Sequence, residues 1–98
     1  MRLQKSELKL AVREAVGKYL NLQAYDVFIF GSEAAGTATD QSDIDIGILG
    51  PKPVSKAIIQ RIRDELESIR TLRVFDVVDL AVTDASFQQK ALQTAERI

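Results

Sequence analysis

The stretch Val27–Ser32 (VFIFGS), followed after ten residues by Asp43–Ile46 (DIDI), decides the fold of this chain. The apolar run predicts a buried strand, and Gly31-Ser32 predicts a turn whose N–H groups and hydroxyl can approach a phosphate. Side chains alternate along a strand, so Asp43 and Asp45 are predicted to share one face. Two carboxylates beside such a turn indicate a divalent-metal site.

The composition limits the chemistry open to the chain. Its 98 residues predict one domain, residues 1–98, and a hydrophobic content of 46% suits a modest core. There is no Cys and no His, which excludes disulfides, thiolate zinc sites and a Ser-His-Asp triad. Any metal must therefore be held by oxygen ligands, which favours Mg²⁺ or Mn²⁺.

The charge balance and hydropathy bear on partners and location. Thirteen basic and 14 acidic residues give a net charge of -1, which argues against electrostatic attraction to nucleic acid. No apolar run approaches the ~18 residues of a membrane span, and the N-terminus lacks a signal-peptide pattern. We expect a cytoplasmic protein, with the Lys and Arg of its long helices as surface charges.

Hydrophobic periodicity predicts the element order α-β-β-α-β-α. The predicted helices are 6–21, 54–70 and 87–97, with a single helical turn at 33–36, and the predicted strands are 25–30, 43–49 and 73–82. The first two strands are joined too closely for a helical crossover, which predicts an antiparallel pair. The helix 54–70 can cross over to the third strand, which predicts a parallel pair. The fold class is therefore α/β (α+β), a small mixed three-stranded sheet with helices packed on one face.

A third acidic segment, Val74–Leu80, follows the second long helix. Asp76 and Asp79 are three residues apart, so on a regular strand they face opposite ways and only one can join the earlier pair.

A structural interpretation without function stays open for the earlier features. Alternation alone predicts a solvent-facing side for Asp43 and Asp45, and Gly-Ser is a common turn.

These features together resemble the signature of the DNA polymerase β-like nucleotidyltransferase superfamily: Gly-Ser, ten residues, Asp-x-Asp and a later acidic strand. In length and element order the chain is similar to the minimal nucleotidyltransferase (MNT) group, which includes antitoxin-like members. The resemblance covers residues 25–87. It implies the nucleotidyltransferase core fold.

The resemblance also implies roles for single residues. Gly31 and Ser32 would hold the β- and γ-phosphates of ATP, and Ser42 is a further cofactor-binding candidate. The residues implied for both catalysis and metal binding, with two Mg²⁺ ions, are Asp43, Asp45 and Asp76. The family pattern favours Asp76 over Asp79 as the third acid, which leaves Asp79 as a structural or surface carboxylate.

The leading hypothesis is Mg²⁺-dependent transfer of AMP from ATP to a hydroxyl. By resemblance the acceptor lies on a helical HEPN-type partner, a toxin whose Tyr is adenylylated by its antitoxin. The alternative is a non-catalytic module that binds a nucleotide or a partner, because Ala35 stands where the family often has a phosphate-pairing Arg. Transfer to nucleic acid or to an antibiotic is disfavoured, because the sequence shows neither a basic patch nor a second domain.

Overall fold

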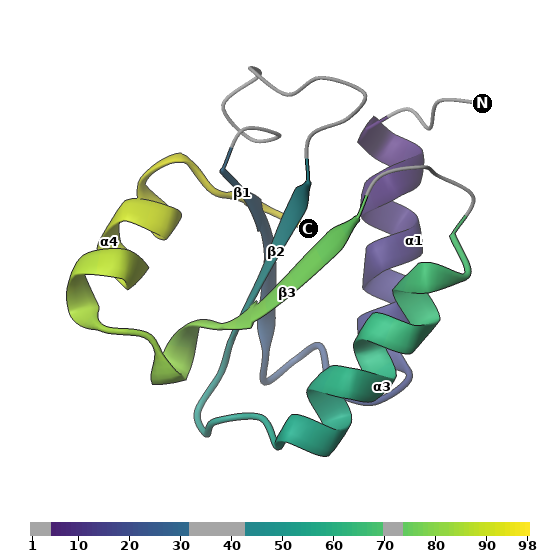
Figure 1. Ribbon diagram of the computed structural model, residues 1–98, viewed down its shortest axis with the longest axis horizontal. Helices are drawn as coiled ribbons and strands as arrows, with labels where there is room; N and C mark the ends of the chain where they lie inside the picture. The colour runs from purple at the N-terminus through teal and green to yellow at the C-terminus, as the bar shows by residue number, and fades with distance from the viewer. Residues whose placement is uncertain (1–4, 32–42, 70–73) are drawn as a thin grey trace.

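The computed structural model describes residues 5–31, 43–69 and 74–98, which form a mixed α/β fold (Figure 1). The elements are α1 (Lys5–Gly17), β1 (Asp26–Phe30), β2 (Ile44–Leu49), α3 (Lys56–Glu67), β3 (Phe75–Asp79), the 3-10 helix η1 (Leu80–Val82), α4 (Ala85–Thr94) and β4 (Glu96–Arg97). This order confirms the three predicted strands and the long helices, but residues 80–82, predicted as the end of the third strand, form η1 instead. The strand ends there because the Asp79 side chain accepts from the N–H of Ala81 and caps η1. The turn predicted at 33–36 lies outside the described residues.

The sheet is mixed, as predicted, with the strand order β3-β2-β1-β4. β1 and β2 are antiparallel, and β2 and β3 are parallel across the α3 crossover. The sheet has four strands, so the prediction of three was wrong by one. β4 is only two residues long and polar, which is too short to show the alternation that reveals a strand.

Two kinds of contact hold β4 against β1. The N–H of Ile98 donates to the carbonyl of Val27 over 2.8 Å, and the Arg97 guanidinium pairs with Asp26 at 2.6 Å. Glu96 also pairs with Lys5 and Lys9 of α1. The last strand is therefore held by contacts between residues far apart in the sequence, which a local sequence pattern does not predict.

The main core lies between the sheet and the helices α1 and α3, which cover the same face (Figure 1). Its apolar side chains come from alternate strand positions and from one stripe of each helix. The buried members are Leu8, Val12, Ala15, Val16, Val27, Ile29, Ile44, Ile46, Ile48, Ile62, Leu66 and Val77.

The helix α4 packs on the opposite face, which corrects the prediction that the helices share one face. A second core cluster there joins Phe30 to Leu80 and Ala91. The physical reason is that β1 is apolar on both sides, because Phe28 and Phe30 alternate with Val27 and Ile29. A sheet that is apolar on both faces needs cover on both.

A glycine in β2 lets this second cluster close. A Cβ at Gly47 would lie 2.9 Å from Cδ1 of Leu80 and 3.4 Å from Cδ1 of Phe30. The ring of Phe87 in α4 meets the ring of Phe30 edge-on, with centroids 6.2 Å apart.

Among the described residues, no helix is long and apolar enough to cross a membrane.

Candidate functional site

Gly31 directly follows β1, at the end of the sheet where β2 begins. The antiparallel register pairs Phe30 with Asp45, so the chain turns beside that carboxylate. Gly31 has a φ of 71°, and a Cβ built there would overlap Oδ2 of Asp45. Only glycine combines this left-handed conformation with this close approach, so Gly31 is required at the site for two separate reasons.

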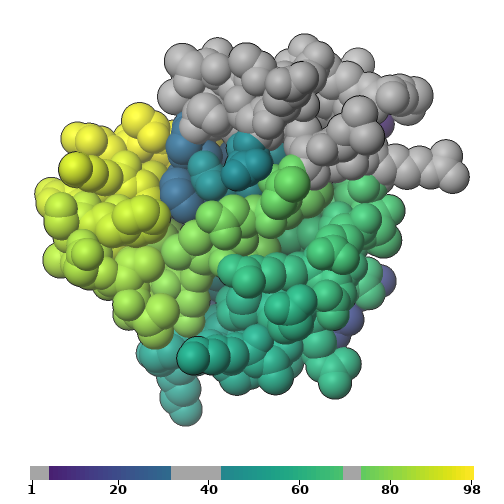
Figure 2. All heavy atoms as spheres, in the orientation of Figure 1, coloured from purple at the N-terminus to yellow at the C-terminus, as the bar shows by residue number. Residues whose placement is uncertain are grey.

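Three predicted acids lie at this end of the sheet. The parallel register pairs Asp45 of β2 directly with Asp76 of β3. Asp43 precedes β2 by one residue, is exposed, and is two positions from Asp45. In Figure 2, atoms of β1 and β2, in blue and teal, lie at the bottom of a hollow between α4 and β3. The strand register therefore places Asp45 and Asp76 side by side at this end of the sheet, with Asp43 two residues before Asp45.

The pKa of the Asp45 carboxyl is raised above its ordinary value. Partial burial is the largest cause, and the negative charges of Asp76 and Asp43 add to it. Both neighbours act in the same direction because like charges make ionisation of Asp45 harder. The three carboxylates therefore repel one another when ionised, and a bound cation would reduce this repulsion.

The donor set fits a hard divalent cation, since carboxylate oxygens are the ligands that Mg²⁺ prefers. The glycine cradle around Asp45 and the crowding of its charge agree with that chemistry. Yet among the described residues no three acidic side chains converge closely enough to hold a metal ion. The three acids are thus neighbours on the sheet, and their carboxylates would have to turn toward one point to share a metal ion.

Asp79 takes no part in this cluster. It lies on the face of β3 opposite to Asp76 and is only 9% exposed. Its Oδ2 accepts from the N–H of Val54 at 2.7 Å, and its Oδ1 accepts from the N–H of Ala81 at 3.1 Å. Asp79 is therefore a structural carboxylate that ties the end of β3 to the start of α3.

One charged residue near the site was not singled out from the sequence. Nη2 of Arg63, on α3, lies 3.9 Å from Oδ1 of Asp76 and donates to the carbonyl of Val77 at 3.0 Å. Its position on an outward-facing part of α3 gives no local signal, because the contact depends on how α3 packs beside β3. The predicted cofactor-binding residues Ser32 and Ser42, and the departure at Ala35, lie outside the described residues.

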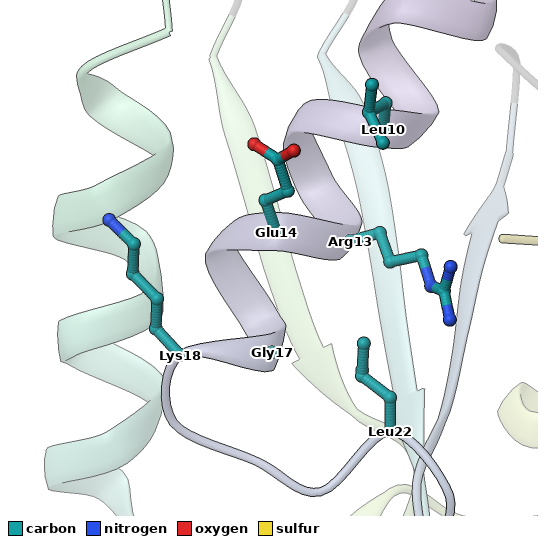
Figure 3. A pocket seen from close by; sticks show the side chains of 6 residues that line it. All are labelled: Leu10, Arg13, Glu14, Gly17, Lys18 and Leu22. Atoms are coloured by element: carbon teal, nitrogen blue, oxygen red, sulfur yellow. The ribbon is translucent and has the colours of Figure 1, made fainter.

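A separate hollow of about 570 Å³ lies along the outer side of α1 (Figure 3). Its lining residues are Leu10, Arg13, Glu14, Gly17, Lys18 and Leu22. A Cβ at Gly17 would come within 3.1 Å of Leu22 Cδ1, which explains a glycine at the end of α1. Because α1 covers the sheet face away from Asp45 and Asp76, this hollow is not part of the acidic site.

Comparisons with solved structures show the same fold. One relative is described as a crystal structure of a toxin–antitoxin with AMP-PNP; it is 18% identical, with a TM-score of 0.74, covering 91% of this chain and 70% of that one. A crystal structure from Shewanella oneidensis is 17% identical, with a TM-score of 0.73, covering 96% of this chain and 71% of that one. A third, from the same organism, is described as a tri-AMPylated HEPN toxin in complex with MNT antitoxin; it is 15% identical, with a TM-score of 0.68, covering 96% and 71%.

At the level of sequence, none of the curated proteins matches this chain. A family model described as "Polymerase beta, Nucleotidyltransferase" does match, over residues 14–98. That match includes the glycine turn, all three acids of the site and every strand of the sheet. The chain therefore belongs to the polymerase beta nucleotidyltransferase family.

Proposed function

We propose that this protein transfers AMP from ATP to a hydroxyl of a partner protein, with Asp43, Asp45 and Asp76 as its catalytic acids. The observation that carries the proposal is the placement of Asp45. It is paired in register with Asp76 on one side and pressed against the left-handed Gly31 on the other. Family membership supports the class of reaction, and this geometry supports its assignment to these three acids.

The proposed step is a single displacement at the α-phosphorus of ATP. The acceptor oxygen forms a bond to that phosphorus, the bond between the α-phosphorus and the bridging oxygen breaks, and pyrophosphate leaves. Asp76 is the most exposed of the acids in β2 and β3, and we assign it the acceptor proton. Mg²⁺ held by the three acids would neutralise charge on the phosphates. Gly31, Ser32 and Ser42 are assigned to phosphate binding.

Two relatives support the substrate and the partner. One is described with AMP-PNP, an ATP analogue, and another as an AMPylated HEPN toxin with its MNT antitoxin. By extension, ATP is the proposed substrate here, and a helical HEPN-type protein is the proposed acceptor. This chain would then be the antitoxin of a toxin–antitoxin pair.

The test is label transfer to the protein encoded by the adjacent reading frame. The chain is incubated with Mg²⁺, this partner and ATP radiolabelled at the α-phosphate or, in parallel, at the γ-phosphate. The proposal expects label on the partner from the α-position only, and its loss in Asp45→Asn. Asp64→Asn, which removes a carboxylate from the exposed side of α3, is the matched control and should transfer normally. Equal labelling by wild type and Asp45→Asn would refute the assignment.

One observation favours the alternative of a non-catalytic binding module. Within residues 5–31, 43–69 and 74–98, the acids do not converge on a single metal position. A module of this kind would form a stable complex with the partner and transfer no label at all. The same experiment, with complex formation followed by size-exclusion chromatography, therefore separates the two functions.

A further inference from the structure

Arg63 links α3 to the outer strand of the sheet. Among the described strands, β3 lies at the edge of the sheet and pairs with β2 alone. Although Arg63 belongs to a helix that covers one face, its Nη2 donates to the main-chain carbonyl of Val77 at 3.0 Å. The same nitrogen lies 3.9 Å from Oδ1 of Asp76. One guanidinium thus touches both the backbone and the side chain of the segment that carries the third acid.

We propose that Arg63 is a positioning residue that holds Asp76 in register with Asp45, so that both carboxylates can bind the same divalent cation. This inference rests on the proposed function. It adds a residue from α3 to a site whose other described members lie on or beside the strands.

The ion pair alone does not explain the arrangement. The side chains of Arg63 and Asp76 are 43% and 55% exposed, and exposed pairs of this kind are weak. The hydrogen bond to Val77 adds a second anchor, because it holds the guanidinium against the main chain of β3 independently of the Asp76 side chain. Nη2 of the planar guanidinium carries two N–H groups in fixed directions and can point at both acceptors at once, whereas a Lys ammonium acts as a single point charge.

Positioning matters most on this strand. Asp45 is in a central strand, whereas Asp76 is in an edge strand that is paired on one side only. The negative charges of Asp45 and Asp76 also repel each other. Residues that orient a metal ligand from outside the ligand set affect metal affinity by about 10–100-fold. Arg63 occupies such a place.

The experiment measures Mn²⁺ binding to the full chain without nucleotide, by the electron paramagnetic resonance signal of free Mn²⁺. The variants are Arg63→Ala and Arg63→Lys, with Arg61→Ala as the control on the same helix. Arg61 lines a hollow with Tyr19 and Glu65 instead of contacting Asp76. Positioning predicts that Arg63→Ala weakens Mn²⁺ binding about tenfold, that Arg63→Lys lies between Ala and wild type, and that Arg61→Ala binds as wild type does.

The direction of the change is decisive. A guanidinium that merely repelled the metal would give tighter binding once removed, so unchanged or tighter binding in folded Arg63→Ala overturns the inference. If circular dichroism shows that Arg63→Ala is unfolded, Arg63→Lys decides instead: weaker binding than wild type supports positioning, and equal or tighter binding overturns it. A wild type that binds no Mn²⁺ would refute the metal site itself, and with it the proposed function.

A kinetic readout separates positioning from general damage. With labelled ATP and the partner, Arg63→Lys is expected to raise the Mg²⁺ concentration needed for half-maximal transfer while keeping most of the rate at saturating Mg²⁺. A fall in the saturating rate with an unchanged Mg²⁺ requirement would overturn the inference and leave the proposed function intact.

Discussion

Gly31 lies against the carboxylate of Asp45 so closely that any side chain at position 31 would overlap Oδ2. The φ of 71° at Gly31 adds a second constraint, because L-residues rarely adopt that conformation. The described residue with a positive φ thus lies beside an acid whose pKa is raised by burial and by neighbouring carboxylates.

Gly31→Ala is therefore expected to lower the free energy of unfolding by about 1–2 kcal/mol and to displace Asp45. Chemical denaturation measures the first effect and Mn²⁺ affinity the second. Gly17→Ala is the matched control, because its Cβ meets only the flexible end of Leu22 at 3.1 Å. A Gly31→Ala variant as stable as wild type, with normal Mn²⁺ affinity, would contradict the geometry described here.

The stability of the protein should depend on pH through Asp45. Its pKa is raised in the folded state, so the unfolded chain ionises first and folding is penalised at every pH above both values. Asp45→Asn removes this penalty. We expect the variant to be more stable than wild type at neutral pH by about 0.5 kcal/mol, a modest value because the charges are partly solvated.

The difference between Asp45→Asn and wild type should shrink as the pH falls toward about 4, where the carboxyl of the unfolded chain becomes protonated. Urea unfolding at several pH values measures it. Asp64→Asn should show no such trend. A stabilisation by Asp45→Asn that persists unchanged in acid would mean that charge is not its cause.

The two acids of β3 should behave in opposite ways. Asp79→Ala leaves the N–H groups of Val54 and Ala81 without their acceptor, and is expected to cost about 2 kcal/mol of stability. Asp76→Asn should keep wild-type stability and lower label transfer about 100-fold or more, as expected for loss of a proton acceptor. Thermal melting and the transfer assay distinguish them. A reversal, with Asp76 needed for folding and Asp79 for transfer, would refute the assignment.

Divalent cations with a nucleotide should stabilise the folded chain. At about 100 times its Kd, a ligand that binds only the native state adds about 2.7 kcal/mol, so Mg²⁺ with AMP-PNP should raise Tm. Chelation with EDTA should return Tm to its starting value, and Asp43→Asn should weaken the response. If AMP-PNP raised Tm equally with and without Mg²⁺, the acids would not be acting through a metal.

Much of the fold was predictable because its strands are regular. The short connection between the first two strands and the length of the 54–70 crossover predicted the antiparallel and parallel pairs that the structure has. The side taken by α4 was predicted wrongly, although Phe28 and Phe30 make both faces of β1 apolar. β4 was not predicted, because two residues are too few to show an alternating pattern and because its partners, Asp26 and α1, are distant in sequence.

The site residues could be predicted from the sequence where their spacing along a strand decides their position. They could not be predicted where the packing of separate elements decides it. The alternation of Asp43 and Asp45, and the opposite facing of Asp76 and Asp79, follow from the period of a strand. The register of β3 on β2, which pairs Asp76 with Asp45, needed the structure. Arg63 could not be found from the sequence, because only the packing of α3 beside β3 brings it there.

The two-sided cover of the sheet has a practical consequence for assays. α1 lies across the sheet from the acids, its Leu10 is 58% exposed, and the sequence contains no cysteine. Leu10→Cys would therefore accept a maleimide dye at one known position, with a full layer of backbone between the fluorophore and the acidic face. Anisotropy of that dye would report association with a binding protein while the opposite surface stays open to nucleotide.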